Sequence, residues 1–286
     1  MSTAIISESI SGNKPYQVMA RAALPLLVRQ AEAAVPIVYS DLAEELGMPN
    51  PRNLNFVLGR IGQSLELLSE LWRIKVPPIQ CLVVNKSTGL PGEGIGLFPV
   101  KKEEFKALPL RQKRAIVEAE LQQVFSFMRW HEVLKALELK AVQSDITALV
   151  NKATGGFGGG ESDEHKALKA YVAKNPKVIG LGANAPVGLT EYFLPSGDSL
   201  DISFRGKKVW VAAEVKSSLS ADGDIVRGLF QCVKYRAVME AILLTESRPQ
   251  NARALLVLES KFPESLIPLR NMLGVEVFDG ISPDKG

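Results

Sequence analysis

The chain has 286 residues, of which 46% are hydrophobic, and its 34 Lys and Arg residues against 31 Asp and Glu residues leave a formal net charge of +3. This length suits two domains better than one core, and the mild charge excludes a strongly basic domain, so any nucleic-acid surface must come from local clustering. Two cysteines exclude a disulfide scaffold and a cysteine metal framework. The sequence has neither a signal-peptide hydrophobic region nor an apolar run of membrane length, so we expect a cytoplasmic protein with no membrane partner.

The N-terminal half contains a helix-turn-helix pattern. Residues 35–48 predict a short strand and then a helix that Ser40 caps and Gly47 ends. A second helix is expected to begin near Pro51, because proline is favoured at a first helical position. Its apolar residues recur at helical spacing: Val57, Leu58, Ile61, Leu65 and Leu68. Two helices joined by a glycine-containing turn make up the helix-turn-helix motif.

A wing is expected after the second helix, because residues 76–85 predict a strand and residues 86–94 are rich in turn-forming residues. Residues 36–94 resemble the DNA-binding winged helix of the O6-alkylguanine-DNA alkyltransferases and alkyltransferase-like proteins, in the stretches VPIVYSDLAEELG and VPPIQCLVVN…TGLPGEG. The alkyl-acceptor cysteine of that family lies in a Pro-Cys-His-Arg signature, whereas Cys81 follows Gln80 and precedes Leu82. With no adjacent histidine to lower the pKa of its thiol, Cys81 is predicted to be a buried, unreactive strand residue.

The resemblance implies that residues 1–150 form a winged helix-turn-helix domain with a helical extension. Its second helix carries side chains suited to reading bases or gripping the phosphate backbone: Arg52, Asn53, Asn55 and Arg60. Winged helices also bind proteins, and the remainder of the chain is what favours DNA as the partner.

Residues 111–127 and 130–139 predict two amphipathic helices in the extension. A basic cluster precedes and enters the first of them, at Lys101, Lys102, Lys106, Arg111, Lys113 and Arg114. This cluster would either track a DNA backbone or form a solvated helix face together with Glu103 and Glu104.

A glycine-rich segment separates the two halves. Five of the six residues from 155 to 160 are glycine, which is incompatible with the interior of a packed helix or strand. Residues 151–160 are therefore predicted to be a linker, and residues 161–286 a second domain. A phosphate-binding loop is the alternative, but no P-loop Lys-Ser/Thr follows and Glu161 would repel a phosphate.

The second domain carries a predicted β-hairpin with charged residues on both strands. Residues 197–204 and 209–216 alternate between apolar and polar positions, with Asp201 on the first strand and Glu214 and Lys216 on the second. A two-residue turn at Gly206–Lys207 would place Asp201 opposite Ala212 and diagonal to Glu214. Diagonal neighbours lie about 7–8 Å apart, so the two carboxylates could share one divalent cation.

Asp201 followed by Glu214–Val215–Lys216 resembles the core of the PD-(D/E)XK nuclease superfamily, which includes restriction endonucleases and Holliday-junction resolvases. The resemblance covers about residues 155–278, including a helix at 161–169 before the hairpin and one at 224–236 after it. It implies that Asp201, Glu214 and the Val215 carbonyl hold Mg²⁺, for which Mn²⁺ can substitute, and that Lys216 orients the attacking water.

An acidic residue on the first helix completes the metal site in this family. Glu164 is favoured for that role, with Glu161 and Asp163 as alternatives, and His165 could approach the same site. On the later helix, Gln231 would support the catalytic site; a polar stripe shared with Tyr235 is its ordinary explanation.

Two further charged residues each have both a functional and a purely structural explanation. Lys234 would contact DNA phosphates, or would merely solubilise its helix. Asp198 reads as a turn residue beside Gly197, with a ligand role as its alternative.

Strands at 252–258 and 274–278, with a helix over 224–244, complete the prediction of an α/β fold: a restriction-endonuclease-like mixed sheet flanked by helices, preceded by a mainly helical winged-helix domain. The expected function is that of a metal-dependent DNA endonuclease of restriction, defence or repair type. The alternative is a DNA-binding regulator or recruitment factor whose nuclease fold does not cleave, and an RNA-directed nuclease stays open. Restriction enzymes commonly cut as dimers, so a homodimer is compatible with this function although the sequence carries no dimerisation signal.

Overall fold

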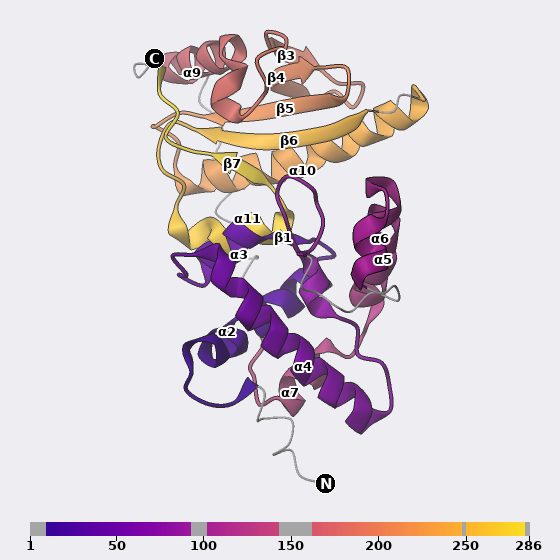
Figure 1. Cartoon of the computed structure of the whole chain (residues 1–286). Coiled ribbons are helices and arrows are strands. Elements are labelled where there is room, and N and C mark those ends of the chain that lie inside the picture. Colours follow the sequence, from indigo (N-terminus) through magenta and orange to yellow (C-terminus); the bar gives the residue numbers. More distant parts are fainter. Residues whose placement is uncertain (1–9, 93–101, 143–161, 248–249, 284–286) are drawn as a thin grey trace. The chain divides into compact units, whose positions relative to one another are not determined.

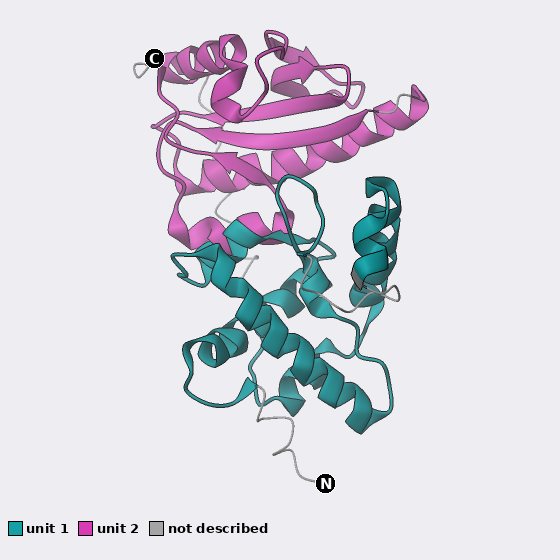
Figure 2. Cartoon of the chain, viewed as in Figure 1, with its two compact units in different colours: residues 1–143 teal, residues 144–286 magenta. Residues whose placement is uncertain are grey.

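The structure is a computed structural model that describes residues 10–92, 102–142, 162–247 and 250–283 (Figure 1). It divides into two compact units, Met1–Gln143 and Ser144–Gly286, coloured separately in Figure 2. Each unit is described by itself. The predicted linker at 151–160 lies outside the described residues.

Unit 1 is mainly helical and packs around the long helices α2 (Pro15–Glu32) and α4 (Leu54–Trp72). Leu24 and Leu27 of α2 share its core with Leu54 and Ile61 of α4. The remaining elements, in chain order, are β1 (Ile37–Val38), α3 (Tyr39–Glu45), η1 (Pro51–Asn53), η2 (Ile79–Leu82), β2 (Val83–Val84), α5 (Lys102–Ala107), α6 (Leu110–Ser126) and α7 (Trp130–Ala136).

The predicted helix-turn-helix elements are present as α3 and α4. Gly47 adopts a φ of +64° just after α3, the left-handed conformation that ends many helices. The second helix begins at Pro51 as the 3₁₀ turn η1 and continues into α4, as predicted. The expected cap is wrong: Val38 occupies the N-cap position, and Ser40 lies inside α3, where its hydroxyl bonds Asp41.

The predicted strand at 76–85 is largely wrong. Residues 79–82 form the 3₁₀ turn η2, and only Val83 and Val84 are extended, pairing in parallel with β1. Cys81 is buried as expected, but in the 3₁₀ turn instead of a strand. Burial and the negative charge of Glu120 raise the pKa of its thiol to about 12, which disfavours the thiolate that a nucleophile requires.

Unit 2 contains a five-stranded mixed sheet in its described part, in the order β3-β4-β5-β6-β7. The first three strands are antiparallel, and β5, β6 and β7 are parallel. The strands are β3 (Leu189–Phe193), β4 (Ser199–Arg205), β5 (Val209–Lys216), β6 (Asn251–Leu258) and β7 (Glu276–Phe278); the helical elements are α9 (Asp163–Lys174), η3 (Pro176–Ile179), α10 (Asp222–Thr245), η4 (Glu264–Leu266) and α11 (Ile267–Leu273).

Helices cover both faces of this sheet (Figure 1). Leu168 and Val172 of α9 pack on one side, against Phe204 and Val211. Leu229 of α10 belongs to a second core on the other side, which it shares with buried sheet residues such as Trp210, Ala212 and Leu256. The α/β class and the mixed sheet flanked by helices agree with the sequence prediction. Within the described part of the chain, no helix combines the length and the apolarity needed to cross a bilayer.

The register of the predicted hairpin differs from the expected one. Arg205 pairs with Trp210, and the Gly206 N–H donates to the Val209 carbonyl at 3.0 Å, so the turn lies at Lys207–Lys208, one residue later than the predicted turn at Gly206–Lys207. Ser203 is therefore the residue opposite Ala212, and Asp201 lies one step beyond the last ladder pair, Ile202↔Ala213, on the line of Glu214. A shift of two residues preserves which side chains share a face, so the predicted grouping of charged residues survives the error.

Candidate active site

The candidate site lies where β4 and β5 stop pairing. Leu200 belongs to the core on the α10 side, whereas Ile202 belongs to the core on the α9 side, so the alternation of side chains breaks at the residue between them. That residue is Asp201, whose Oδ2 accepts a hydrogen bond from the backbone N–H of Val215 at 2.8 Å. A side chain thus replaces the backbone pairing at this point and fixes one carboxylate beside β5.

Glu214 is the most buried charged group of the site, with only 3% of its side chain exposed. Its Oε1 accepts a hydrogen bond from Lys216 Nζ at 2.7 Å. Its Oε2 is also buried and has no hydrogen-bond partner among the described residues. A buried carboxylate oxygen without a donor is costly, so it marks a position where a ligand would lower the energy of the fold.

The two carboxylates have opposite electrostatic behaviour. Burial, and then the negative charge of Asp201, raise the pKa of Glu214 to about 7, and the Lys216 ammonium offsets only part of this. For Asp201, burial disfavours the charged form, but His165 and the Val215 N–H outweigh it and lower the pKa of this carboxyl. The carboxyl of Asp201 therefore has a lowered pKa, whereas the pKa of the Glu214 carboxyl lies near neutral pH, as expected for two close acidic groups.

Helix α9 brings His165 to the site and leaves Glu164 exposed. The imidazole Nε2 of His165 lies 3.7 Å from Asp201 Oδ2, and 17% of the His165 side chain is exposed. Glu164 is exposed, and so is Asp163, whose carboxylate lies 3.4 Å from Lys166 Nζ. The remaining acidic candidate, Glu161, lies outside the described residues.

Helix α10 closes the opposite side of the site. Gly228 allows a close approach: a Cβ there would lie 2.8 Å from Leu256 Cδ1 and 3.2 Å from Lys216 Cε. One turn further along, Gln231 Nε2 donates to the Tyr235 hydroxyl at 3.2 Å, and that hydroxyl donates to the Ser199 carbonyl at 3.1 Å. Gln231 therefore acts on the end of β4 through Tyr235, and its own Oε1 is buried without a hydrogen-bond partner among the described residues.

Other predicted residues lie away from this centre. Lys234 Nζ is 2.6 Å from the carboxylate of Asp198, which also accepts from the Ser196 hydroxyl. Asp198 thus belongs to the turn before β4. The ligand role considered for it has no support in these contacts, and the charge of Lys234 is already paired.

Sequence analysis missed Glu191, because strand β3 was not predicted. The register between β3 and β4 places Glu191 across from Asp201, with a φ of +53°. Its carboxylate pairs with the buried ammonium of Lys169 and accepts from the Ser199 hydroxyl at 3.2 Å. The pairing with a helix residue four positions after His165 ties α9 to the sheet, and no local sequence pattern signals it.

The described residues do not form a ready-made metal cluster of three or more His, Cys, Asp or Glu side chains. The oxygen donors that the fold brings together are the carboxylates of Asp201 and Glu214, with the Val215 backbone between them.

Comparison with known proteins adds no assignment. No family model matches this chain, and neither does any curated protein or any solved structure. Any account of its function therefore depends on the residues themselves.

The predicted DNA-contacting residues of unit 1 lie at the start of α4. Arg52, Asn53 and Asn55 are exposed, whereas Arg60 is half-buried, bonds Gln63 at 2.9 Å and stacks on the Tyr16 ring at 5.2 Å. Arg60 is thus partly committed within the unit. The exposed group at η1 and the first turn of α4 comprises one cation and two amides, which suits contacts with a phosphate backbone.

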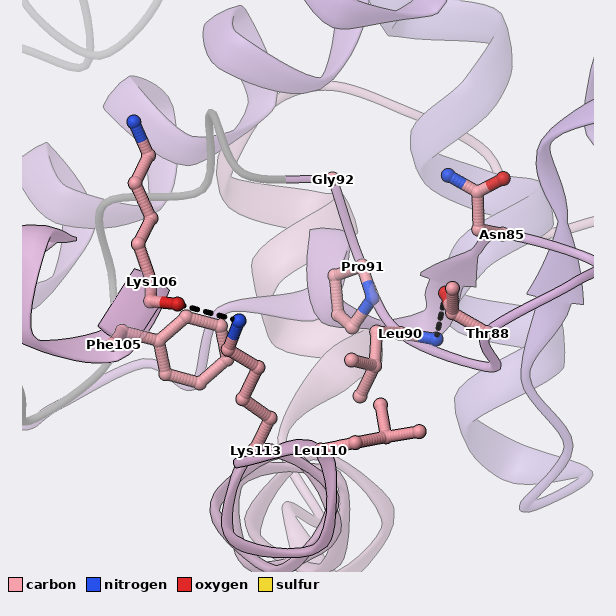
Figure 3. Close-up of a pocket in the computed structure, with 9 residues that line it drawn as sticks. All are labelled: Asn85, Thr88, Leu90, Pro91, Gly92, Phe105, Lys106, Leu110 and Lys113. Carbon is pink, nitrogen blue, oxygen red and sulfur yellow. Dashed lines mark hydrogen bonds between the residues drawn. The ribbon is translucent and has the colours of Figure 1, made fainter. Parts of the chain in front are cut away.

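Unit 1 also contains a cavity of about 290 Å³, shown in Figure 3. It is lined by Asn85, Thr88, Leu90, Pro91, Gly92, Phe105, Lys106, Leu110 and Lys113. Lys113 Nζ donates to the Lys106 carbonyl at 2.8 Å and lies over the Phe105 ring, so this ammonium is engaged within the wall. The cavity shares no residue with the carboxylate site of unit 2.

Proposed function

We propose that this protein is a metal-dependent DNA endonuclease of the PD-(D/E)XK type, with its hydrolytic site in unit 2. One observation carries the proposal: Asp201, Glu214 and Lys216 meet where two strands part, and one buried oxygen of Glu214 has no hydrogen-bond partner within the described part of the chain. Two carboxylates and a lysine in this arrangement suit hydrolysis of a phosphodiester bond.

The donor set fits a hard divalent cation such as Mg²⁺. Such ions prefer carboxylate and carbonyl oxygens, and a cation would relieve both the orphaned Glu214 oxygen and the repulsion that raises the pKa of Glu214. Asp201, Glu214 and the Val215 carbonyl would hold the ion. When bound, it would supply a water of lowered pKa and positive charge for the developing oxyanion.

The protein's own groups hold the reacting parts in position. The Val215 N–H fixes the orientation of Asp201, so this carboxylate does not have to be ordered when substrate arrives. Lys216, 13% exposed, is held by Glu214 with its ammonium at the same site. That ammonium is placed to orient the attacking water and to offset charge on a phosphoryl oxygen.

Unit 1 would bring the DNA. In this proposal Arg52, Asn53 and Asn55 contact the phosphate backbone from the start of α4, as in a winged helix. The sequence resemblance to alkyltransferase-like winged helices supports this role, whereas the buried thiol of Cys81, with its raised pKa, argues against alkyl transfer.

The test is cleavage of supercoiled plasmid and of branched DNA by the full chain, with Mg²⁺ and with EDTA. Asp201→Asn keeps an oxygen that can accept from the Val215 N–H, so it should retain the fold and lose cutting. Asp198→Asn is the matched control, because it removes a neighbouring carboxylate that pairs with Lys234 outside the site.

Metal-dependent cutting that is lost in Asp201→Asn and kept in Asp198→Asn would support the nuclease. Equal cutting by Asp201→Asn and the parent protein would refute it. Tight, salt-sensitive DNA binding without cutting by any of the proteins would favour the recruitment factor with a non-cleaving nuclease fold.

A further inference from the structure

We propose that Lys169 and Ser199 form a binding subsite for a backbone phosphate of the nucleic acid, beside the carboxylate site, and that Glu191 occupies this subsite until a phosphate displaces it. The inference rests on the proposed function, since it takes the substrate to be a phosphodiester strand that passes Asp201. It adds a contact outside the hydrolytic group: an anion site whose occupant is a side chain of the protein itself.

The subsite consists of a cation and a hydroxyl that already bind an anion. The ammonium of Lys169 pairs with one carboxylate oxygen of Glu191, and the Ser199 hydroxyl donates to the other at 3.2 Å. The non-bridging oxygens of a phosphodiester can accept the same bonds, because an ammonium forms charge-assisted hydrogen bonds with phosphate as it does with carboxylate. The donor set therefore suits a backbone phosphate.

The exposure of the two charged partners indicates from which side a ligand would arrive. Only 7% of the Lys169 side chain is exposed, whereas 54% of the Glu191 side chain is. The carboxylate therefore lies on the solvent side of the ammonium, and an anion that displaces Glu191 reaches Lys169 directly. A buried ammonium holds an anion more strongly than an exposed one, because solvent and salt screen the pair less.

The backbone conformation of Glu191 favours its release. This residue has a φ of +53°, in the left-handed region that residues with a side chain rarely adopt. The pairs on either side of it are regular, Thr190 with Ile202 and Tyr192 with Leu200. Such strain persists only where the surroundings enforce it, and the bonds of the carboxylate to α9 and β4 do so here. Displacement of the carboxylate would let the backbone relax.

The subsite lies beside the proposed hydrolytic group. Glu191 lies across from Asp201 on the neighbouring strand, and adjacent strands are about 4.8 Å apart. Lys169 follows His165 by four residues on α9, so their side chains share a face of the helix, and His165 Nε2 lies 3.7 Å from Asp201 Oδ2. A strand with its scissile phosphate at Asp201 would therefore place a neighbouring phosphate within reach of Lys169.

The experiment measures the affinity of the full chain for a fluorescein-labelled DNA duplex by anisotropy over a salt series, in EDTA so that no metal-dependent cutting occurs. Glu191→Gln, Lys169→Met and the double variant form a double-mutant cycle. Glu240→Gln is the matched control, because it removes an exposed carboxylate of unit 2 from α10 and leaves the subsite intact. Circular dichroism checks the fold of each protein.

We expect Glu191→Gln to tighten duplex binding by about three- to tenfold, because the phosphate no longer competes with a carboxylate for Lys169. Lys169→Met should bind more weakly and lower the slope of log K against log salt by about 1, because one phosphate contact is lost. In the Lys169→Met background, the gain from Glu191→Gln should be largely lost. Glu240→Gln should change the affinity by less than about twofold.

A further variant leaves the buried lysine untouched. Glu191→Gly accepts a positive φ without strain and lacks the carboxylate, so it should fold and should tighten binding as Glu191→Gln does. Its comparison with Glu240→Gln decides the inference even if Lys169→Met folds poorly.

Three results would overturn the inference, and they differ in what else they remove. If Glu191→Gln and Glu191→Gly bind the duplex no more tightly than Glu240→Gln, the pair with Lys169 is only a structural tie. An equal gain from Glu191→Gln in the Lys169→Met background would show that Glu191 merely repels DNA. Both of these results leave the proposed function intact if plasmid cutting depends on Asp201. Absence of duplex binding and of Mg²⁺-dependent cutting in every protein would remove the subsite and the nuclease together.

Discussion

The carboxylate of Asp201 accepts the backbone N–H of Val215, at 2.8 Å, at the step where β4 ceases to pair with β5. This single bond does two things. It satisfies the Val215 N–H, which has no backbone acceptor on β4 at this step. It also fixes the carboxylate of Asp201 beside the buried carboxyl of Glu214. The local fold and the electrostatics of the site therefore depend on the same contact.

Glu214 makes stability depend on pH. Its ordinary pKa is 4.5, and burial together with Asp201 raises it to about 7. Between these values the folded chain binds more protons than the unfolded chain, so the free energy of unfolding falls as pH rises through this window and levels off above it. The upper bound of the fall is about 3–4 kcal/mol, because the two pKa values lie about 2.5 pH steps apart and each step contributes about 1.4 kcal/mol.

Denaturation of the metal-free protein between pH 5 and pH 8 checks this, with Glu214→Gln for comparison. The variant should lack the fall, because its amide does not titrate. Asp201 does not interfere, since a lowered carboxyl pKa changes stability only at more acidic pH. An identical pH profile in the two proteins would show that Glu214 is already ionised at pH 5.

The sequence predicted the elements whose pattern is local. Apolar residues of α4 and α10 repeat at helical spacing, and β5 and β6 are short, mainly apolar runs, so the positions of these elements agree with prediction within a few residues. Strand β3 was not predicted because four of its five residues are exposed, which removes the alternation of apolar and polar residues that marks a strand. The hairpin register was not predicted because it depends on where the turn lies: the Gly206 N–H to Val209 carbonyl bond encloses Lys207 and Lys208, one residue later than the expected turn at Gly206–Lys207.

The site was predictable in part for the same reason. Asp201, Glu214 and Lys216 are carried by one hairpin, so strand alternation alone groups them. His165 lies 36 positions before Asp201, and only the packing of α9 on the sheet sets their distance. Glu191 depends on both an unpredicted strand and a positive φ, neither of which a local pattern indicates.

DNA affinity should depend on Arg52. Its side chain is exposed, and the Asn50 side chain holds its backbone N–H at 3.0 Å, so Arg52→Ala preserves the turn before α4. If this guanidinium contacts a phosphate, the variant should bind duplex DNA several-fold more weakly, and the slope of log K against log salt should fall by about 1. Fluorescence anisotropy over a salt series measures both quantities.

The control for Arg52 is Lys135→Ala, which removes another exposed cation of unit 1, on α7. It should leave both affinity and salt slope unchanged. Equal losses in the two variants would mean that binding follows net charge and not the start of α4.

Breaking the pair between Arg29 and Glu45 should destabilise unit 1. The guanidinium of α2 makes two bonds to the carboxylate of α3, at 2.5 and 2.9 Å, and both side chains are buried. Glu45→Ala leaves a buried cation without its counter-charge, which should cost about 3–5 kcal/mol. Replacing both residues, as Arg29→Met with Glu45→Leu, should cost less, because no charge is left behind.

Chemical denaturation followed by circular dichroism tests this order of stabilities. Glu132→Ala is the control, since its partner Arg129 lies on the surface and solvent screens the pair; little change is expected there. A double variant less stable than Glu45→Ala would contradict the argument, because it would make the pair a net source of stability.

Gly228 should be needed for the geometry of the carboxylate site. In Gly228→Ala the new Cβ would lie 2.8 Å from Leu256 Cδ1 and 3.2 Å from Lys216 Cε, so both side chains must move. Overpacking of this size typically costs about 1–3 kcal/mol, and displacement of Lys216 should reduce cleavage beyond the loss of folded protein.

Gly59→Ala is the matched control, because its helix position has nothing within 4 Å and alanine there should stabilise by about 0.5–1 kcal/mol. Denaturation midpoints and plasmid cleavage at a temperature where both variants are folded separate the two effects. Full activity in a destabilised Gly228→Ala would mean that Leu256 alone absorbs the methyl group and that the position of Lys216 is not set by α10.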